Sequence, residues 1–129
     1  GDMTKGLEII PCELIDHNGD TLKEILIELA QHNHMDASFI QWITDANRYY
    51  NTLVDRIVPG YPRNEDKELW NQLGYIDQNM VVGEIFHLWV IDGKTVKELE
   101  KKLPTQKANL NVLFVDSIKP YKERKVKMQ

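Results

Sequence analysis

The chain has 129 residues, of which 42% are apolar and 28% charged, so it corresponds to one soluble globular domain or to part of one. Its net charge of -4 argues against nucleic acid as the main partner, and no segment approaches the run of about 18 apolar residues that a membrane span requires. The single cysteine excludes an intramolecular disulfide, and with no signal-peptide pattern at its start the chain is expected to be cytoplasmic.

The first elements predicted along the chain are a strand, a turn and a helix. The apolar run LEIIPCELI (residues 7–15) is typical of a buried strand, and the polar DHNGD after it predicts a tight turn. Thr21 and Glu24 form a T-x-x-E capping box. Apolar residues then recur at helical spacing, which predicts a helix over residues 22–30.

The middle of the chain predicts two more helices and a second strand. Asp36 is a candidate N-cap for a long helix whose apolar stripe extends to Ile57, where a Pro-Gly pair ends it. After a polar loop, KELWNQL predicts a short helix that ends at Gly74. The segment 80–92 is rich in β-branched and aromatic residues, which favours a strand.

The last third repeats the alternation of helix and strand. Thr95 and Glu98 form another capping-box pattern, and Pro104 ends the helix that follows it. LNVLFVDSI (residues 110–118) predicts a final strand, and PYKERKVKMQ predicts the beginning of another helix. The elements alternate, so the fold class is α/β or α+β.

Two polar clusters have the residue types of metal ligands but not their spacing. The contiguous HNH at residues 32–34 lacks a third ligand, and a polar cluster at the end of a helix is favoured by the helix dipole alone. The oxygen atoms of DHNGD at residues 16–20 fall at the wrong intervals for a calcium loop. No metal site is predicted.

Charged residues inside apolar phrases need partners. Asp55 and Arg56 interrupt NTLVDRIVP, and Glu84 interrupts VVGEIFHLWV. An internal ion pair, or an arginine at a helix C-terminus, explains the first case, and a strand residue facing water explains the second. Residue patterns alone predict no more than a soluble α/β domain.

Four phrases in register carry a resemblance to a known family. PCELIDHNGD, NTLVDRIVPGYPR, VGEIFHLWV and PYKERKVK occur in this order and spacing. Together they resemble the mannitol dehydrogenase family of polyol-type long-chain dehydrogenases, and within it the members that interconvert tagaturonate and altronate. The resemblance extends from about Leu7 to the end of the chain.

The resemblance implies a fold, a division into domains and a position within a longer chain. Residues 1–118 are expected to be the C-terminal portion of an NAD-binding, Rossmann-like domain, with its later strands and inserted helices. Residues 119–129 are expected to begin a truncated helical C-terminal domain. No G-x-G-x-x-G occurs in the chain, so the residues that bind the cofactor stay unknown and the chain is expected to be a central piece of an enzyme.

The activity implied by the resemblance is hydride transfer between NAD and a small sugar acid in hexuronate catabolism. The rest of the parent chain is the only macromolecular partner expected, with no nucleic acid and no membrane. A fructuronate-type or mannitol-type dehydrogenase of the same family is one alternative. A non-catalytic interaction module that shares ancestry with these enzymes is another.

The resemblance assigns the exchange of the alcohol proton to Lys125. A lysine with its ordinary pKa of about 10.4 is a poor base at neutral pH, so this role requires burial or neighbouring cations. Arg124 and Lys127 are cations close to it in sequence. In this chain alone we expect Lys125 to be an ordinary exposed lysine, and a solvated charge run is the alternative interpretation of KERKVK.

The other assignments concern the substrate. Asp55 matches a family aspartate that contacts substrate hydroxyls. Leu14 stands where mannitol-type members carry an Asn that holds the developing oxyanion, and Asn18 is therefore either a substitute that binds substrate or a turn residue. Lys122 stands where polyol enzymes tend to carry Glu, and an extra cation suits a substrate with a carboxylate. Both departures favour tagaturonate over mannitol.

Overall fold

The computed structural model describes residues 1–128 and divides the chain into two units. The first unit combines Gly1–Val54 with the chain from Leu88 onward, and the second is Asp55–His87. Within residues 1–128, no helix is both long enough and apolar enough to cross a membrane.

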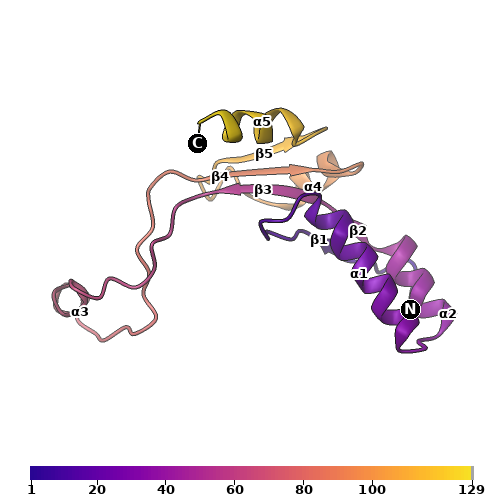
Figure 1. The fold of residues 1–129 in the computed structure, drawn as a ribbon, viewed down its shortest axis with the longest axis horizontal. Helices are drawn as coiled ribbons and strands as arrows, with labels where there is room; N and C mark the ends of the chain where they lie inside the picture. Colours follow the sequence, from indigo (N-terminus) through magenta and orange to yellow (C-terminus); the bar gives the residue numbers. More distant parts are fainter. Residues whose placement is uncertain (129) are drawn as a thin grey trace. The chain divides into compact units, whose positions relative to one another are not determined.

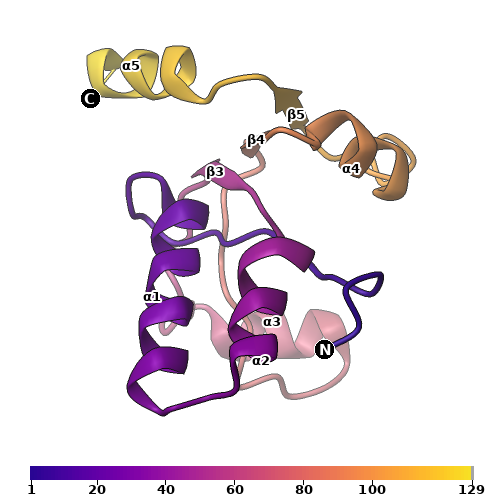
Figure 2. The same ribbon diagram turned by 90° about the vertical axis from the view of Figure 1, so that its right-hand side faces the viewer.

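The first half of the first unit is a strand, a group of helices and a parallel strand. Strand β1 (Glu8–Ile9) pairs with β2 (Arg48–Tyr49), so that Glu8 lies opposite Arg48 and Ile9 opposite Tyr49. Between the strands lie α1 (Asn18–His32), α2 (Ala37–Gln41) and the π-helical turn η1 (Trp42–Ala46). Helices α1 and α2 contact each other and lie side by side in Figure 2.

The second half adds a three-stranded sheet in the order β3-β4-β5. Strands β4 (Leu88–Asp92) and β5 (Val112–Val115) are parallel and are joined through α4 (Val96–Lys102), whereas the arrow of β3 (Asn51–Asp55) runs the opposite way in Figure 1. Helix α5 (Lys119–Met128) follows β5 and runs back along the sheet. The predicted α/β alternation is therefore confirmed.

The long helix predicted from Asp36 to Ile57 is wrong beyond Ala46. The chain instead turns extended and forms β2 and β3. Tyr50 and Thr52 are buried while the residues around them are only half-buried, which is the period of two expected for a strand. Aromatic and β-branched residues in RYYNTLVD favour this conformation and outweigh the apolar spacing that suggested a helix.

Three predicted strands are shorter than expected, and of residues 110–118 only β5 is a strand. Of residues 7–15 only β1 is a strand, because Pro11 has no N–H to continue the ladder and the chain turns into a loop after it. Of residues 80–92 only β4 belongs to the sheet, and Val82 forms an isolated bridge with Gly60.

The predicted helices α1, α3 (Asp66–Leu73) and α4 are confirmed, but neither capping box forms. The N-terminus of α1 is capped from another element, because Asn51 Oδ1 accepts hydrogen bonds from the N–H groups of Gly19 (3.0 Å) and Asp20 (3.1 Å). A Cβ on Gly19 would lie 2.1 Å from the carbonyl oxygen of Tyr50, so glycine permits this close approach.

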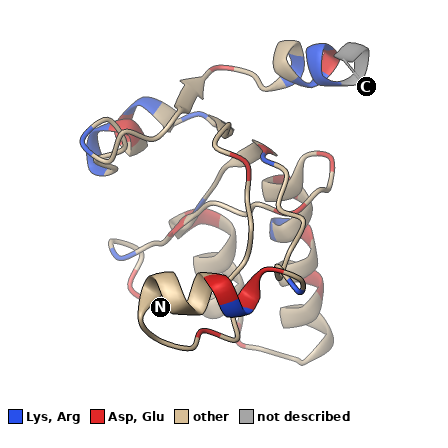
Figure 3. Cartoon of the chain, turned by 90° about the vertical axis from the view of Figure 1, so that its left-hand side faces the viewer, with Lys and Arg blue, Asp and Glu red and all other residues tan. Residues whose placement is uncertain are grey.

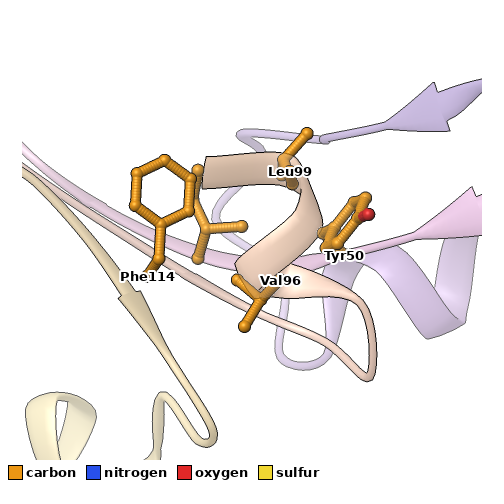
Figure 4. Packing of buried hydrophobic residues seen from close by; sticks show 5 residues of the cluster. Tyr50, Val96, Leu99 and Phe114 are labelled. Atoms are coloured by element: carbon orange, nitrogen blue, oxygen red, sulfur yellow. The ribbon is translucent and has the colours of Figure 1, made fainter. Parts of the chain in front are cut away.

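The core of the first unit lies between α4 and the strands. Tyr50, Ile91, Val96, Leu99 and Phe114 form one buried cluster, drawn as sticks in Figure 4. Four of them come from the β4-α4-β5 segment, which is contiguous in sequence, and the fifth, Tyr50, lies between β2 and β3. Burial of these side chains fixes the sheet that carries β3.

The hydroxyl group of Tyr50 links this core to a charged cluster. It donates to Glu8 Oε2 at 2.6 Å and lies 2.8 Å from Thr95 Oγ1. Glu8 also forms ion pairs with Lys102 and, at 3.4 Å, with Arg48. Burial raises the pKa of Glu8, but hydrogen bonds from Lys102 and Tyr50 outweigh this effect, so the net pKa is lowered.

Replacing Glu8 by glutamine is expected to reduce stability at neutral pH by roughly 1–3 kcal/mol, because hydrogen bonds to an ionised group are lost. The folded pKa is below the ordinary value of about 4.3, so the carboxylate stabilises the fold above that pH and loses this effect as the pH falls through the folded pKa. Urea unfolding at pH 7 and pH 3 measures both effects, and the difference between variant and parent should shrink at the lower pH. The exposed Glu24→Gln on α1 is the control, and an equal change in both variants would contradict the prediction.

The second unit is held together by hydrogen bonds and contains no buried residue. Glu84 accepts the N–H of Ile57 on its side chain (2.6 Å), and its backbone carbonyl accepts Nε of Arg56 (3.0 Å). Trp70 of α3 donates its indole N–H to the carbonyl of Asp77 (2.9 Å), and Gly74 ends α3 at a positive φ of 80°, as predicted. Arg56 therefore follows a strand, and the expectations of a helix C-terminus here and of Glu84 simply facing water are both wrong.

Candidate functional site

Helix α5 begins at a point fixed by β4. The backbone N–H of Ile118 donates to Asp92 Oδ2 at 2.7 Å, and the Ile118 side chain is buried. Burial raises the pKa of Asp92, while this hydrogen bond acts in the opposite direction. The contact anchors the chain one residue before α5 and directs the helix along the sheet.

The loop between β1 and α1 is held by Asn18. Its Nδ2 lies 3.1–3.3 Å from the carbonyl oxygens of Pro11, Glu13 and Thr52 and from Thr52 Oγ1, while its Oδ1 accepts the N–H of Thr52 at 2.8 Å. The residue is only 3% exposed. Both polar atoms of the amide are thus engaged within the protein, and they tie the loop to β3.

Lys125 lies at the carboxyl end of β3. Its Nζ donates to the carbonyl oxygen of Val54 at 3.1 Å, and the residue is half-buried. The expectation that Lys125 is an ordinary exposed lysine in this chain is therefore wrong, because α5 folds back along the sheet. The side chain of Lys127, the neighbouring cation named from the sequence, lies outside the described part of the chain.

Lys122 lies one helical turn before Lys125 and forms an ion pair with Asp16 of the β1-α1 loop. The hydrogen bond from Lys122 lowers the pKa of Asp16. Asp16 Oδ1 also lies 3.8 Å from Nε2 of His17. Figure 3 shows both Lys or Arg and acidic segments on the helix that leads to the C-terminus, and Lys122 brings one positive charge of α5 to this loop.

A pocket of about 120 Å³ lies where the loop, β3 and the start of α5 meet. Leu14 is on its wall and is 91% exposed. The lining residues are Cys12, Glu13, Leu14, Ile15, Asp16, His17, Thr52, Leu53, Val54, Ile118 and Lys122. The lining therefore combines apolar residues with two acidic residues and one basic residue, plus His17.

Asp55 is the last residue of β3 and directly follows Val54, the residue that Lys125 contacts. It belongs to the second unit and is half-buried. Chain connectivity therefore brings the backbone of Asp55 next to the strand position at which Lys125 is held. Asn18 accepts the N–H of Thr52 on the same strand.

A comparison with protein-family models shows to which family the chain belongs. Residues 1–105 match the model of the mannitol dehydrogenase Rossmann domain. The chain belongs to the mannitol dehydrogenase family. This confirms the predicted fold class, part of a Rossmann-like domain.

Curated relatives of this chain in the mannitol dehydrogenase family are named altronate oxidoreductase. The protein of Enterobacter sp. (strain 638) is 53% identical over 126 residues, which are 98% of this chain and 26% of the relative. The protein of Yersinia enterocolitica is 50% identical over the same length and the same shares. The chain thus spans about a quarter of the length of these relatives.

Two solved structures of dehydrogenases share the fold. The ternary complex of Pseudomonas fluorescens mannitol 2-dehydrogenase with NAD and D-mannitol has a TM-score of 0.67 at 26% identity, covering 92% of this chain and 23% of that one. Substrate-free D-sorbitol dehydrogenase has a TM-score of 0.65 at 25% identity, covering 88% of this chain and 22% of that one. The similarity extends over nearly the whole of the present chain.

The sequence missed two residues that shape this site. The sequence pattern predicts only a turn at Asp16 and a helix at Thr52. The partners of both residues are distant in sequence, Lys122 for Asp16 and Asn18 for Thr52, so no local spacing could have revealed them. Leu14 and Lys122 line one pocket, and Lys125 contacts Val54 on the wall of that pocket.

Proposed function

We propose that this chain is part of an NAD-dependent oxidoreductase that interconverts tagaturonate and altronate. The observation that carries the proposal is the position of Lys125, whose amine is held at the carboxyl end of β3 beside the pocket. Relatives named altronate oxidoreductase support the choice of substrate, because they match 98% of the chain at 50–53% identity.

The chain's own residues do not form a pyrophosphate site, because none of its seven glycines lies in a G-x-G-x-x-G pattern. A bound nicotinamide supplies or accepts the hydride. The steps that we assign to this chain concern the substrate end alone. NAD is proposed as cofactor because the family is defined by a Rossmann domain and because NAD is present in the mannitol 2-dehydrogenase complex.

Lys125 is proposed to exchange the alcohol proton. In the direction of reduction its ammonium group donates a proton to the oxygen that becomes the hydroxyl of altronate, and in oxidation the neutral amine accepts that proton. The carbonyl group of Val54 accepts a hydrogen bond from Nζ and so orients the amine. The rest of the site that buries the amine is proposed to come from other parts of the full-length enzyme.

Asp55 is proposed to bind hydroxyl groups of the substrate, since a carboxylate accepts two hydrogen bonds from a polyol chain. For Asn18 the hydrogen bonds to Pro11, Glu13 and Thr52 support a role in holding the loop over a direct contact with substrate. Leu14 supplies no donor to an oxyanion, which supports a sugar-acid dehydrogenase over a mannitol-type enzyme. We propose a cytoplasmic location, with the remainder of the parent chain as partner.

The proposed function is tested with the full-length enzyme and with the 129-residue chain in parallel. We expect the full-length enzyme to oxidise NADH with tagaturonate faster than with fructose or fructuronate. The 129-residue chain alone should neither bind NADH in titration calorimetry nor turn over any keto-acid, because it has no glycine-rich phosphate turn. Micromolar binding of NADH to this chain would mean that the cofactor site is misplaced.

A further inference from the structure

We propose that Asp16 is a positioning residue that sets the preference of the site for substrates with a carboxylate, by holding the ammonium group of Lys122 at the pocket. The inference rests on the proposed function, because it concerns the substrate of the same site. Lys122 is the group that contacts the substrate carboxylate, and Asp16 acts through it.

Lys122 lines this pocket, and Lys125, from the same face of α5, contacts Val54 on the pocket wall. Lys122 and Lys125 are three residues apart, which places them on neighbouring turns with roughly 5–6 Å between their Cβ atoms. Lys122 pairs with Asp16 and Lys125 donates to Val54, and both partners line the pocket. A sugar acid carries both a carboxylate and a reacting carbonyl, so a pair of amines at this spacing suits such a ligand.

The ion pair leaves Lys122 able to bind a second carboxylate. An ammonium group has three N–H donors and no acceptor, so the hydrogen bond to Asp16 occupies one donor and leaves two. The Lys122 side chain is 42% exposed, which keeps its head accessible to a ligand entering the pocket. A lysine without a fixed partner samples many rotamers, and ordering it would weaken the binding of substrate.

Asp16 is itself held in place and ionised. Its backbone carbonyl accepts a hydrogen bond from Thr21 Oγ1 at 3.4 Å, just before the first turn of α1. His17 and Lys122 are the cationic or titratable groups within 4 Å of its carboxylate among the described residues. The position of the carboxylate is thus set by the loop that Asn18 ties to β3, and Lys122 is drawn to that position from α5.

The test measures kcat and KM of the full-length enzyme for tagaturonate and for the neutral ketose fructose. Lys122→Met should raise KM for tagaturonate roughly ten- to a hundredfold, with kcat little changed, because a charge-assisted hydrogen bond is lost. Asp16→Asn should raise the same KM about threefold, in line with an exposed ion pair, and Asp16→Glu should restore most of the loss. KM for fructose should stay unchanged, and Glu24→Gln, an exposed residue of α1 outside the pocket lining, is the control.

Two results of the kinetic measurements would overturn the inference. A lower KM for tagaturonate in Asp16→Asn would mean that Asp16 competes with the substrate for Lys122. An equal loss with fructose would mean that Asp16 only stabilises the fold. Calorimetric titration with altronate separates this inference from the proposed reaction. If the enzyme binds altronate and Lys122→Met weakens this binding, but tagaturonate is not turned over, only the proposed reaction is overturned. If altronate does not bind, or if Lys122→Met and Asp16→Asn both leave its binding unchanged, the inference is overturned.

Discussion

Replacing Lys125 by methionine in the full-length enzyme is expected to lower turnover by about a hundredfold or more, with little change in the affinity for NADH. General acid-base groups contribute roughly 10² to 10⁴ to a rate, and methionine preserves the length and apolar stem of lysine while removing the exchangeable proton. The half-buried position of Lys125 and its hydrogen bond to Val54 support this assignment. Steady-state kinetics with tagaturonate and NADH measure the loss.

The pH profile and a neighbouring lysine provide the controls for this substitution. Alcohol oxidation requires the unprotonated amine, so the profile of the parent enzyme should contain an ionisation that the methionine variant lacks. Lys127→Met, two positions along, should have a much smaller effect. If both variants keep more than about a third of the parent turnover, the assignment fails and KERKVK is a solvated charge run.

Replacing Asn18 by alanine is expected to destabilise the 129-residue chain by roughly 2–4 kcal/mol, because buried partners lose their hydrogen bonds together. The substitution leaves the N–H of Thr52 and the carbonyl groups of Pro11 and Glu13 without the amide that bonds them. Urea unfolding followed by circular dichroism measures the change.

The control for Asn18 is Asn33, an exposed residue whose amide bonds the carbonyl group of Leu29. Asn33→Ala should cost well under half as much, because its partners remain accessible to water. If Asn18→Ala leaves stability unchanged but raises KM for tagaturonate in the full-length enzyme, then Asn18 binds the substrate and is not only a turn residue. A loss of stability with an unchanged KM for folded enzyme supports the loop-holding role.

Local patterns are sufficient for elements whose period and end signals lie within the segment itself. Helices α1, α3 and α4 and strands β4 and β5 lie where periodicity, Gly74 and Pro104 placed them. The segment from Arg48 to Asp55 was assigned to a helix because its apolar residues happen to recur at helical spacing. Pairing with β1 and β4 decides its conformation, and that pairing is tertiary.

The candidate site residues also fall into two groups: those that the family resemblance predicts, and those whose contacts depend on the tertiary fold. Lys125 and Asp55 were predicted from phrases that resemble a family, and the structure places Lys125 beside the strand that ends in Asp55. The predicted capping boxes do not form because residues of other elements supply the polar partners. Asn51 caps the N-terminus of α1, and the hydroxyl group of Thr95, before α4, bonds the hydroxyl group of Tyr50. The ion pair of Asp16 with Lys122 depends on the path of α5, which no pattern within the loop encodes.

The insertion of the second unit between two hydrogen-bonded strands has a consequence for the order of folding. Strands β3 and β4 are neighbours in the sheet, yet all of Asp55–His87 separates them in sequence. Closing so long a loop costs conformational entropy before the pairing repays it, whereas β4, α4 and β5 meet through short connections. The β4-α4-β5 segment, with Ile91, Leu99 and Phe114 already packed together, is thus the natural nucleus, and β3 joins it late. The strand end that holds Lys125 is therefore among the last parts of the sheet to form.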